Sequence, residues 1–362
     1  MSGKSTRAAS LVLAIAATGL LGGIALTSAA HGPCNVTGST AGELRNVDGA
    51  LGEDQVEDSS AIQRAIDQAS RDGGAIVKLP AGTLYLDEPL VVKSNVALRG
   101  AGPDTVLKAS SRFLETKGPY GGHPVITTDG ASNVTIERLT ADHSGDELDG
   151  NVSGRLNEYL VDVRHSKNAV VEQVTTRNPF TYSIAVVGSQ DFCVFNNQTT
   201  AVSSGKYNQL DGIHITDSHS GLVAGNTVDQ RRGEDGDDGL VTQTIGSPVY
   251  NVEFRDNDVR GGSHGSGMQL ALGNHEIRDI RISGNHFWGS QNGIQTGYYG
   301  GSAPVSNILV SGNRFNDIPG PTVIFTGELR NITVTANVQC RSGGVKVDAG
   351  ESNRIDVPSE EC

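Results

Sequence analysis

The fold is decided by four copies of one phrase: Asp211-Gly212-Ile213, Asp238-Gly239-Leu240, Ser266-Gly267-Met268 and Asn292-Gly293-Ile294. Their glycines stand 27, 28 and 26 residues apart. A repeat of this length, with β-branched residues and Gly/Asn turns between the copies, is typical of a solenoid in which each repeat forms one coil. Residues at equal phase then stack on neighbouring coils, about 4.8 Å apart as in a sheet. The sequence therefore predicts a column that contains both aspartates.

Further repeats lie on both sides of this stretch and alternate with period two, as strands with one buried face do. They include residues 94–98, 132–136, 167–171, 250–254, 278–282, 306–310 and 330–334. Several are followed by a small or polar residue and an asparagine: Gly225-Asn226, Asp256-Asn257, Gly284-Asn285, Gly312-Asn313 and Ala336-Asn337. Asparagine tolerates the left-handed conformation of a tight corner, and its amide can bond to the next coil. We therefore expect an asparagine ladder rather than a β-sandwich with regular turns.

A helix is predicted before the repeats begin. Asp58 is its expected cap, apolar residues recur at helical spacing from Ile62 to Ala69, and Gly73 follows its end. Two short strands, 75–79 and 83–86, come next. The helix is expected to cover the open end of the solenoid, where an edge would otherwise be exposed.

The first thirty residues have the form of a secretory signal peptide rather than a membrane anchor. Lys4 and Arg7 precede an apolar run, and small residues follow at 28–30. The sequence thus predicts a signal peptide over 1–30, an irregular segment over 31–57 and a β-helix domain over 58–362. Export to the extracellular medium is expected.

The formal net charge is −13, and it becomes −15 without Lys4 and Arg7. Such a surface disfavours nucleic acid and anionic membranes as partners. A monomer is expected. The four cysteines allow three pairings, and disulfides are the default for an exported chain. We favour Cys340 with Cys362, which would hold the C-terminal tail, and Cys34 with Cys193 by elimination.

Residues 58–86 and 91–102 together resemble the opening of the pectate-lyase-like right-handed parallel β-helix superfamily. The resemblance covers nearly all of the mature chain. It implies an all-β fold, a single-stranded right-handed parallel β-helix with an N-terminal capping helix. The repeat spacing predicts about ten coils. This fold carries hydrolases, lyases, epimerases and phage depolymerases, so the fold alone does not define the activity.

Within that superfamily, residues 206–271 are most similar to the polygalacturonase-type glycoside hydrolases of family 28. That family has Asn-Thr-Asp-Gly, Gly-Asp-Asp and Gly-His-Gly on successive coils. This chain has Gln209-Leu210-Asp211-Gly212, then Gly236-Asp237-Asp238-Gly239, then Ser263-His264-Gly265. The resemblance implies that Asp237 is the general acid, that Asp211 and Asp238 hold the attacking water with inversion, and that His264 tunes the acid.

The residues support the same chemistry without the resemblance. Hydrolysis of a glycoside needs one protonated carboxyl and one carboxylate. Three carboxyl groups crowded on adjacent coils cannot all ionise cheaply, so at least one pKa rises and supplies the acid. The competing explanation is turn chemistry, because Asp-Gly is a common turn pair.

The chain departs from the family pattern at the substrate side of the site. Gln295 and Gly297 stand where the family has the Arg and Lys of its Arg-Ile-Lys element, which hold a uronate carboxylate. This favours a neutral or partly neutral glycan. The candidate substrate-binding residues share polar or aromatic side chains near the phrase repeats: His214, Gln269, Gln295, Tyr298, Tyr299 and Arg232. Lys206, Arg231 and Arg232 are the cations that could instead restore a uronate subsite.

Two other functions stay open. The acidic run that includes Asp237 and Asp238 also suits Ca²⁺, and a calcium-dependent polysaccharide lyase would use Arg231 or Arg232 as its base. The hydrolase needs no metal or other cofactor. The remaining alternative is a non-catalytic β-helix that binds carbohydrate.

Overall fold

The computed structural model describes residues 44–47, 57–148, 158–201, 209–230 and 236–362. The predicted signal peptide, Cys34, Lys206, Arg231 and Arg232 lie outside these residues. Within them, no helix is long and apolar enough to cross a membrane.

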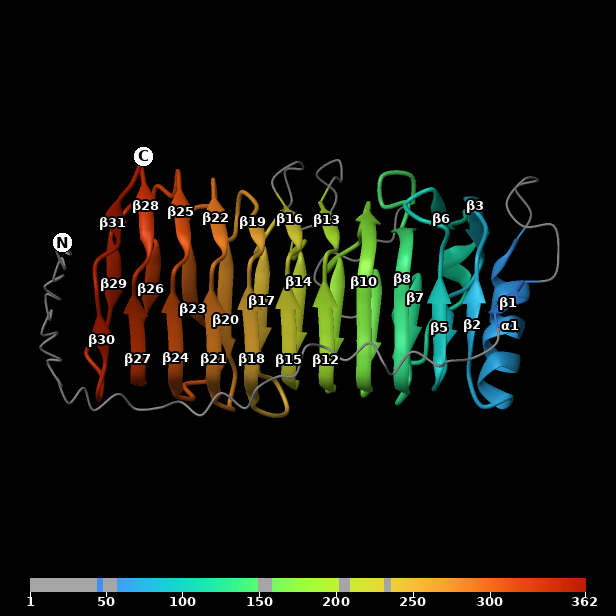
Figure 1. Ribbon diagram of the computed structural model, residues 1–362, viewed down its shortest axis with the longest axis horizontal. Coiled ribbons are helices and arrows are strands. Elements are labelled where there is room, and N and C mark those ends of the chain that lie inside the picture. Colours follow the sequence, from blue (N-terminus) through green and yellow to red (C-terminus); the bar gives the residue numbers. More distant parts are fainter. Residues whose placement is uncertain (1–43, 48–56, 149–157, 202–208, 231–235) are drawn as a thin grey trace, which may run out of the picture. The chain divides into compact units, whose positions relative to one another are not determined.

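Parallel strands stacked coil upon coil make up the described chain (Figure 1). Ten of them form one sheet, which we call the ten-stranded sheet. Its strands are β4 (Leu90–Val92), β7 (Ile126–Thr128), β9 (Val161–Arg164), β11 (Ile184–Val187), β14 (Ile213–Thr216), β17 (Leu240–Gln243), β20 (Met268–Leu272), β23 (Ile294–Tyr298), β26 (Val323–Phe325) and β29 (Val345–Val347). Ten coils were expected from the repeat spacing, and the right-handed parallel β-helix is confirmed.

The other described strands form a second, 21-stranded sheet with two rows. The longer row holds β1 (Leu44–Asn46), β2 (Ala75–Lys78), β5 (Val96–Arg99), β8 (Ser132–Asp142), β10 (Lys167–Arg177), β12 (Gln190–Phe195), β15 (His219–Ala224), β18 (Val249–Arg255), β21 (Ile277–Ser283), β24 (Val305–Ser311), β27 (Leu329–Thr335) and β30 (Arg354–Ile355). The shorter row holds β3 (Gly82–Leu86), β6 (Thr105–Ala109), β13 (Gln198–Thr200), β16 (Thr227–Asp229), β19 (Asp258–Arg260), β22 (His286–Trp288), β25 (Arg314–Asn316), β28 (Val338–Cys340) and β31 (Ser359–Glu360). The long strands β8 and β10 pair with members of both rows and join them.

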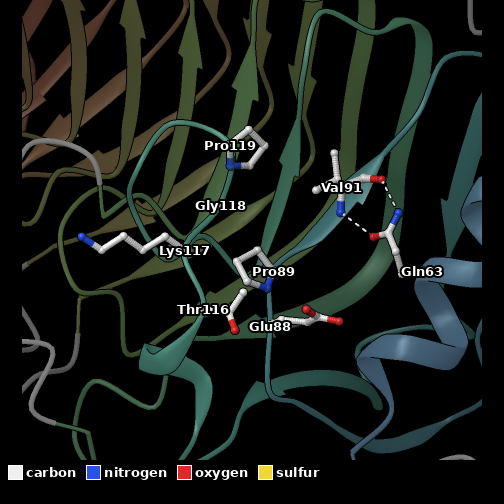
Figure 2. A pocket seen from close by; sticks show the side chains of 8 residues that line it. All are labelled: Gln63, Glu88, Pro89, Val91, Thr116, Lys117, Gly118 and Pro119. Atoms are coloured by element: carbon white, nitrogen blue, oxygen red, sulfur yellow. Dashed lines mark hydrogen bonds between the residues drawn. The ribbon is translucent and has the colours of Figure 1, made fainter.

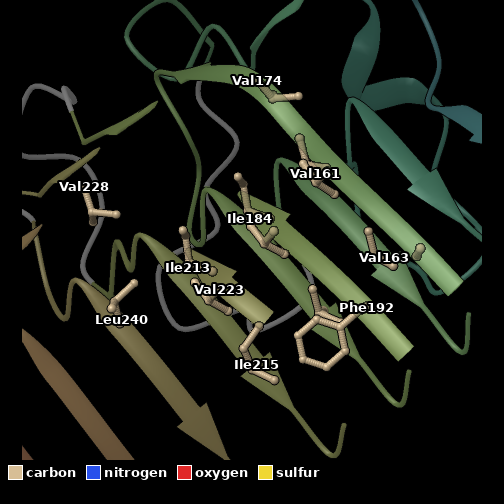
Figure 3. Packing of buried hydrophobic residues seen from close by; sticks show 14 of the residues in the cluster. Val161, Val163, Val174, Ile184, Phe192, Ile213, Ile215, Val223, Val228 and Leu240 are labelled. Atoms are coloured by element: carbon tan, nitrogen blue, oxygen red, sulfur yellow. The ribbon is translucent and has the colours of Figure 1, made fainter. Parts of the chain in front are cut away.

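The core lies between the sheets and is filled by every second residue of each strand. In the ten-stranded sheet Val161, Ile184, Ile213 and Leu240 occupy one register position on successive strands, and all are fully buried (Figure 3). The residues that alternate with these core positions along each strand, such as His214 on β14 and Gln269 on β20, face outward. The period-two alternation of the sequence thus selects which side chains the outer face can present.

The capping helix is confirmed as α1 (Ser59–Arg71), and Asp58 is its N-cap residue as expected. Asp58 stands at the N-cap without a side-chain bond to the helix, and its Oδ2 accepts from the Tyr85 N–H of β3. Glu57 Oε1 accepts from the Ser60 N–H instead, at 2.7 Å. The short Asp58 side chain ties the helix to the first coil, and the longer Glu57 reaches the free N–H groups. A short 3₁₀ helix, η2 (Phe113–Glu115), follows β6.

The asparagine ladder is confirmed and begins one coil earlier than predicted. Five buried members each donate from Nδ2 to the Oδ1 of the next member: Asn197, Asn226, Asn257, Asn285 and Asn313. Asn337 ends the ladder, and its Nδ2 donates to the Val310 carbonyl at 3.0 Å. The expected left-handed conformation belongs to the residue before each asparagine, with φ of 63° at Gly225 and 55° at Asp256. The turn is made one residue earlier, which frees the asparagine side chain to point inward and bond.

The structure also confirms the Cys340–Cys362 disulfide. It joins β28 to the C-terminal residue, as expected for a bond that holds the tail. The pairing of Cys34 with Cys193 stays a prediction, because Cys34 lies outside the described residues.

Candidate active site

The four phrases lie side by side in the ten-stranded sheet, where the strands β14, β17, β20 and β23 begin. Ile213, Leu240, Met268 and Ile294 share one register position. The Gly212 N–H donates to the Asp238 carbonyl at 3.0 Å. Asp211 and Asp238 are therefore neighbours in one column, as the spacing predicted.

Glycine follows each aspartate because the next coil passes too close for a side chain. A Cβ at Gly212 would lie 2.4 Å from the Gly239 carbonyl oxygen and 2.4 Å from Val228 Cγ1. A Cβ at Gly239 would lie 2.4 Å from Val259 Cγ1. The Asp-Gly pairs therefore serve close packing here, in addition to any turn.

Three carboxyl groups meet at this point. Asp211, Asp237 and Asp238 each present an oxygen within 4.8 Å of the others. Asp211 Oδ1 accepts from the Asp238 N–H at 3.1 Å, and Asp238 Oδ1 accepts from the Ser266 N–H at 2.7 Å. These two are buried, whereas Asp237 is half-buried and is the most accessible of the three.

Burial shifts the protonation of all three groups. It raises the pKa of Asp211 and of Asp238 well above the usual value for aspartate, and the charges of the neighbouring carboxyl groups raise both further. Burial also raises the pKa of Asp237, against the lowering influence of His264 and His214. The physical cause is the one expected from the sequence: charged carboxylates lose hydration and repel one another.

His214 was expected to bind substrate directly, and its geometry does not fit that role. Its side chain is buried, its Nδ1 lies 2.7 Å from Asp211 Oδ2, and its Nε2 lies 3.0 Å from Gln243 Oε1. Burial lowers the pKa of His214 to about 3, so the ring is neutral and donates only one hydrogen bond. A neutral ring that donates to Gln243 Oε1 accepts from a protonated Asp211. With the Gln243 amide turned over, the ring donates to Asp211 instead.

The structure also places the other predicted site residues. His264 is exposed, and its backbone N–H donates to the carbonyl of Gly236, the residue before Asp237, at 3.2 Å. Gln269 is buried on the outer face, and its Oε1 accepts from the exposed Tyr299 hydroxyl at 2.9 Å. Burial raises the pKa of the Tyr299 hydroxyl, and the charges of the three aspartates raise it further.

Gln295 and Tyr298 lie one coil further from the acids. Gln295 occupies the register position next to Gln269, and its Oε1 accepts from Asn292 Nδ2 at 3.1 Å. Tyr298 is exposed, and its hydroxyl bonds to the Thr326 carbonyl. The structure thus gathers every described candidate around one stretch of the sheet. Arg232 lies outside the described residues.

Two neighbours of the acids were missed by the sequence analysis. Gln243 contacts His214, and the Tyr182 ring stacks on the His214 ring with centroids 4.0 Å apart. The repeat could have revealed Tyr182, because it stands 29 residues before Asp211 and occupies the same place one coil earlier. Gln243 gave no such signal, since it lies beyond the repeated phrase.

The donor set of the cluster would also suit a cation. Three carboxylates with oxygens within 4.8 Å of one another are hard ligands of the kind Ca²⁺ prefers. Ca²⁺ takes six to eight oxygens, and the three aspartates would hold it only with further ligands. Glu234 and Asp235, the other acids of this run, lie outside the described residues.

A pocket of about 320 Å³ lies at the N-terminal coils, and Figure 2 shows the residues that line it. It is lined in part by Gln63 of α1 and Val91 of β4, whose backbone N–H donates to Gln63 Oε1 at 2.8 Å. Three strands, β7, β9 and β11, separate β4 from β14 in the sheet. This pocket contains none of the candidate site residues.

The fold and the arrangement of the site together are those of the pectate-lyase-like β-helix class. The family model described as rhamnogalacturonase A/epimerase, pectate lyase-like, matches residues 44–295, and the chain belongs to this family.

Relatives in sequence and in structure point to different reactions. The mannuronan C5-epimerase AlgE1 of Azotobacter vinelandii is 30% identical over 257 residues, which are 66% of this chain and 17% of the epimerase. Alginate lyase 7 of the same organism is 30% identical over 197 residues, 52% of this chain and 22% of the lyase. The exopolygalacturonase of Thermotoga maritima superposes with a TM-score of 0.68 at 18% identity and covers 83% of this chain and 81% of its own. The chain thus spans less than a quarter of the length of the epimerase and of the lyase. The likeness to the exopolygalacturonase concerns the fold.

Proposed function

We propose that this protein is a glycoside hydrolase that cleaves a polysaccharide with a polygalacturonase-type acid cluster. The observation that carries the proposal is the meeting of Asp211, Asp237 and Asp238 on the outer face. One carboxyl is accessible and two are buried behind it, and each has a raised pKa. A cluster of this kind holds protons and a negative charge together at the pH where a glycosidic bond must be protonated and attacked.

Asp237 is the proposed general acid, because it is the accessible member and its raised pKa keeps a proton available. It donates that proton to the glycosidic oxygen as the bond to the anomeric carbon breaks. Asp211 and Asp238 hold the water that attacks this carbon, and an ionised carboxylate of this pair takes the water's proton. His214 and Gln243 orient Asp211, and His264 acts on Asp237 from the exposed side.

The stereochemical course deserves its own measurement. The resemblance implies inversion, for which two carboxyl groups usually stand about 6.5–9.5 Å apart. The nearest oxygens of the three aspartates lie within 4.8 Å, which is closer to the spacing of about 5–5.5 Å in retaining enzymes. The water would therefore lie beside the carboxyl groups rather than between two that face each other. Proton NMR of the first product identifies its anomeric configuration.

A second candidate is a uronate C5-epimerase or lyase, favoured by the 30% identity to AlgE1 and to alginate lyase 7. Either reaction removes a proton next to a uronate carboxylate, which needs a base and a nearby cation. Arg231 and Arg232 are the nearest candidates in the chain. In the lyase, Ca²⁺ bound by the acidic cluster would supply further positive charge.

The substrate is proposed to be a neutral or partly neutral glycan, because Gln295 and Gly297 replace the family's two cations. We propose that the hydrolase works as an exported monomer and without a metal.

The deciding experiment is product analysis on polymannuronate, polygalacturonate and a panel of neutral glycans, with and without a chelator. New reducing ends without ultraviolet absorbance, unaffected by chelator and absent with Asp237→Asn, support the hydrolase. Absorbance from an unsaturated product indicates a lyase, and its loss with chelator assigns the acids to Ca²⁺. A changed uronate epimer at constant chain length indicates an epimerase. No reaction with any glycan would leave carbohydrate binding as the function to test.

A further inference from the structure

The outer face of the ten-stranded sheet is closed on one side of the acids and open on the other. One outward register position runs through the strands from β7 to β29: Thr127, Asp162, Ala185, His214, Val241, Gln269, Gln295, Ile324 and Lys346. From Thr127 to Val241 these residues are 0–2% exposed, and Gln269 is 7% exposed. Gln295 and Ile324 are half-buried and Lys346 is exposed. Exposure at this register position thus begins at Gln295, two coils beyond Asp238, and increases toward the C-terminal coils.

The closed side is covered by a row of stacked side chains, which we call the aromatic wall: Tyr120, Arg164, Tyr159 and Tyr182. Tyr182 stacks on His214, and Tyr159 stacks on Tyr182 with centroids 4.8 Å apart and planes 8° apart. The Arg164 guanidinium lies 5.2 Å from the Tyr159 ring and 4.8 Å from the Tyr120 ring. The wall therefore ends against the histidine that bonds to Asp211.

The wall is firmly held in place. Arg164 Nε donates to both carboxylate oxygens of Asp162, at 3.0 and 2.8 Å, and this pair is buried. Tyr159 and Tyr182 pack with Ala185 in one outer cluster. A glycan chain bound against the sheet on this side would have to displace stacked rings and a buried ion pair, which is unfavourable.

The open side presents amides and aromatic rings instead. Beyond the acids lie Gln269 and Gln295, with the exposed Tyr299 ring bonded to Gln269. Gly297 makes room for this pair, since a Cβ there would lie 3.1 Å from both Gln269 Cδ and Tyr299 Cε2. Amides bond sugar hydroxyls, and aromatic rings pack against sugar ring faces. This surface suits the rest of a bound chain.

We propose that the site binds the end of a polysaccharide chain and cleaves from that end, releasing a short product of uniform length. The terminal sugars lie against the end of the aromatic wall at Tyr182, and the remainder of the chain extends over β20, β23, β26 and β29. This inference rests on the proposed hydrolase function. Tyr182 stands one coil before Asp211, so the space on the closed side holds only a short terminal piece.

The first test is a time course of wild-type protein on a glycan that it cleaves, followed by chromatography of the products and by viscosity. Chain-end cleavage yields one short product from the earliest time and lowers viscosity only slowly. Oligosaccharides of the same glycan capped at the reducing end or at the non-reducing end should be cleaved in one case and resist in the other. A broad range of product lengths at early times, with a rapid fall in viscosity, would overturn the inference and leave the hydrolase proposal standing. Failure to cleave any glycan would instead refute the hydrolase proposal, and this inference with it.

The second test removes a ring from the aromatic wall. Tyr182→Ala should raise the fraction of longer products several-fold, whereas Tyr182→Phe, which keeps the stacked ring, should keep the wild-type product pattern. Circular dichroism and the unfolding midpoint verify that each variant folds. Tyr120→Ala, at the half-exposed end of the wall, provides the same comparison if Tyr182→Ala does not fold. An unchanged product pattern in a folded wall variant would contradict the role of the wall.

Discussion

Two columns of buried polar side chains run through this β-helix, and they behave in opposite ways. In the asparagine ladder each amide repeats the bond of its neighbour: Asn257 Nδ2 donates to Asn285 Oδ1 at 2.8 Å and to the Val223 carbonyl at 3.0 Å. In the acidic column Asp211 and Asp238 stand one coil apart, and each bonds to a backbone N–H of the next coil.

The difference comes from the hydrogen-bonding capacity of the two groups. An amide carries donors and an acceptor, so identical amides one coil apart satisfy one another. An ionised carboxylate only accepts, so identical carboxylates one coil apart repel one another unless they retain protons. The same coil geometry that makes the ladder a stable support makes the acidic column a source of protons.

The largest expected effect comes from placing amides in the acidic column. Asp237→Asn, Asp211→Asn and Asp238→Asn should each lower kcat by about 10²–10⁴-fold, the range for loss of a general acid or base. Circular dichroism should be unchanged, because asparagine has the same shape. Asp191→Asn, at an exposed site on β12, is the matched control and should keep full activity. Full activity in the three cluster variants would refute the proposed roles.

Asp238→Asn should also change how stability depends on pH. The folded pKa of Asp238 is raised above its unfolded value of about 4, so the folded protein keeps a proton that the unfolded chain releases. The stabilisation from this proton is fully present below the unfolded pKa and is lost as pH rises through the folded pKa. In chemical unfolding, the variant should therefore match wild type in acid and exceed it at neutral pH. A variant that is less stable at neutral pH would contradict this sign.

The reverse exchange tests the ladder. Asn257→Ala removes the side-chain oxygen that accepts from the backbone N–H and Nδ2 of Asn226, and the side-chain donor to the Val223 carbonyl. At about 1–3 kcal/mol for each unsatisfied buried group, we expect a loss of about 3 kcal/mol or more in urea unfolding. Asn257→Asp should cost more at neutral pH than in acid, since its carboxylate would face the Val223 and Asn285 oxygens. Equal costs at both pH values would show that the ladder tolerates charge.

His214 links the column to the rest of the outer face, and its loss should have an intermediate effect. His214→Ala should lower kcat about 10–100-fold with KM nearly unchanged, because the ring orients Asp211 without contacting substrate. His214→Asn places an amide near the Nδ1 position and should recover part of kcat. A rise in KM alone would instead indicate direct binding of substrate.

The smallest effect is expected for a pair of asparagines that bond as in the ladder but are exposed to solvent. Asn331 Nδ2 donates to Asn307 Oδ1 at 3.0 Å on the exposed side of β27. Asn331→Gly suits the left-handed backbone there, with φ of 53°, and should cost at most about 1 kcal/mol in urea unfolding. A cost as large as that of Asn257→Ala would mean that burial does not set the value of these bonds.

Much of this architecture could be predicted from periodicity. The 27-residue step placed Asp211 and Asp238 in one column, and the repeated asparagines revealed their ladder. Such predictions succeed because a solenoid turns sequence spacing directly into spatial proximity. The turn conformation was assigned to the wrong residue because backbone dihedrals at a corner depend on how the next coil packs.

The repeat therefore determined the coil, the column and the residues that could share it. Only the tertiary structure decided the rest: that His214 lies behind Asp211, that Gln243 supports it and that Tyr182 and Tyr159 close one side of the outer face. Side-chain stacking across coils and burial by covering segments arise from contacts that have no fixed spacing in the chain. Which of three crowded carboxyl groups remains accessible depends on those contacts, because the coil brings all three together and their surroundings separate them.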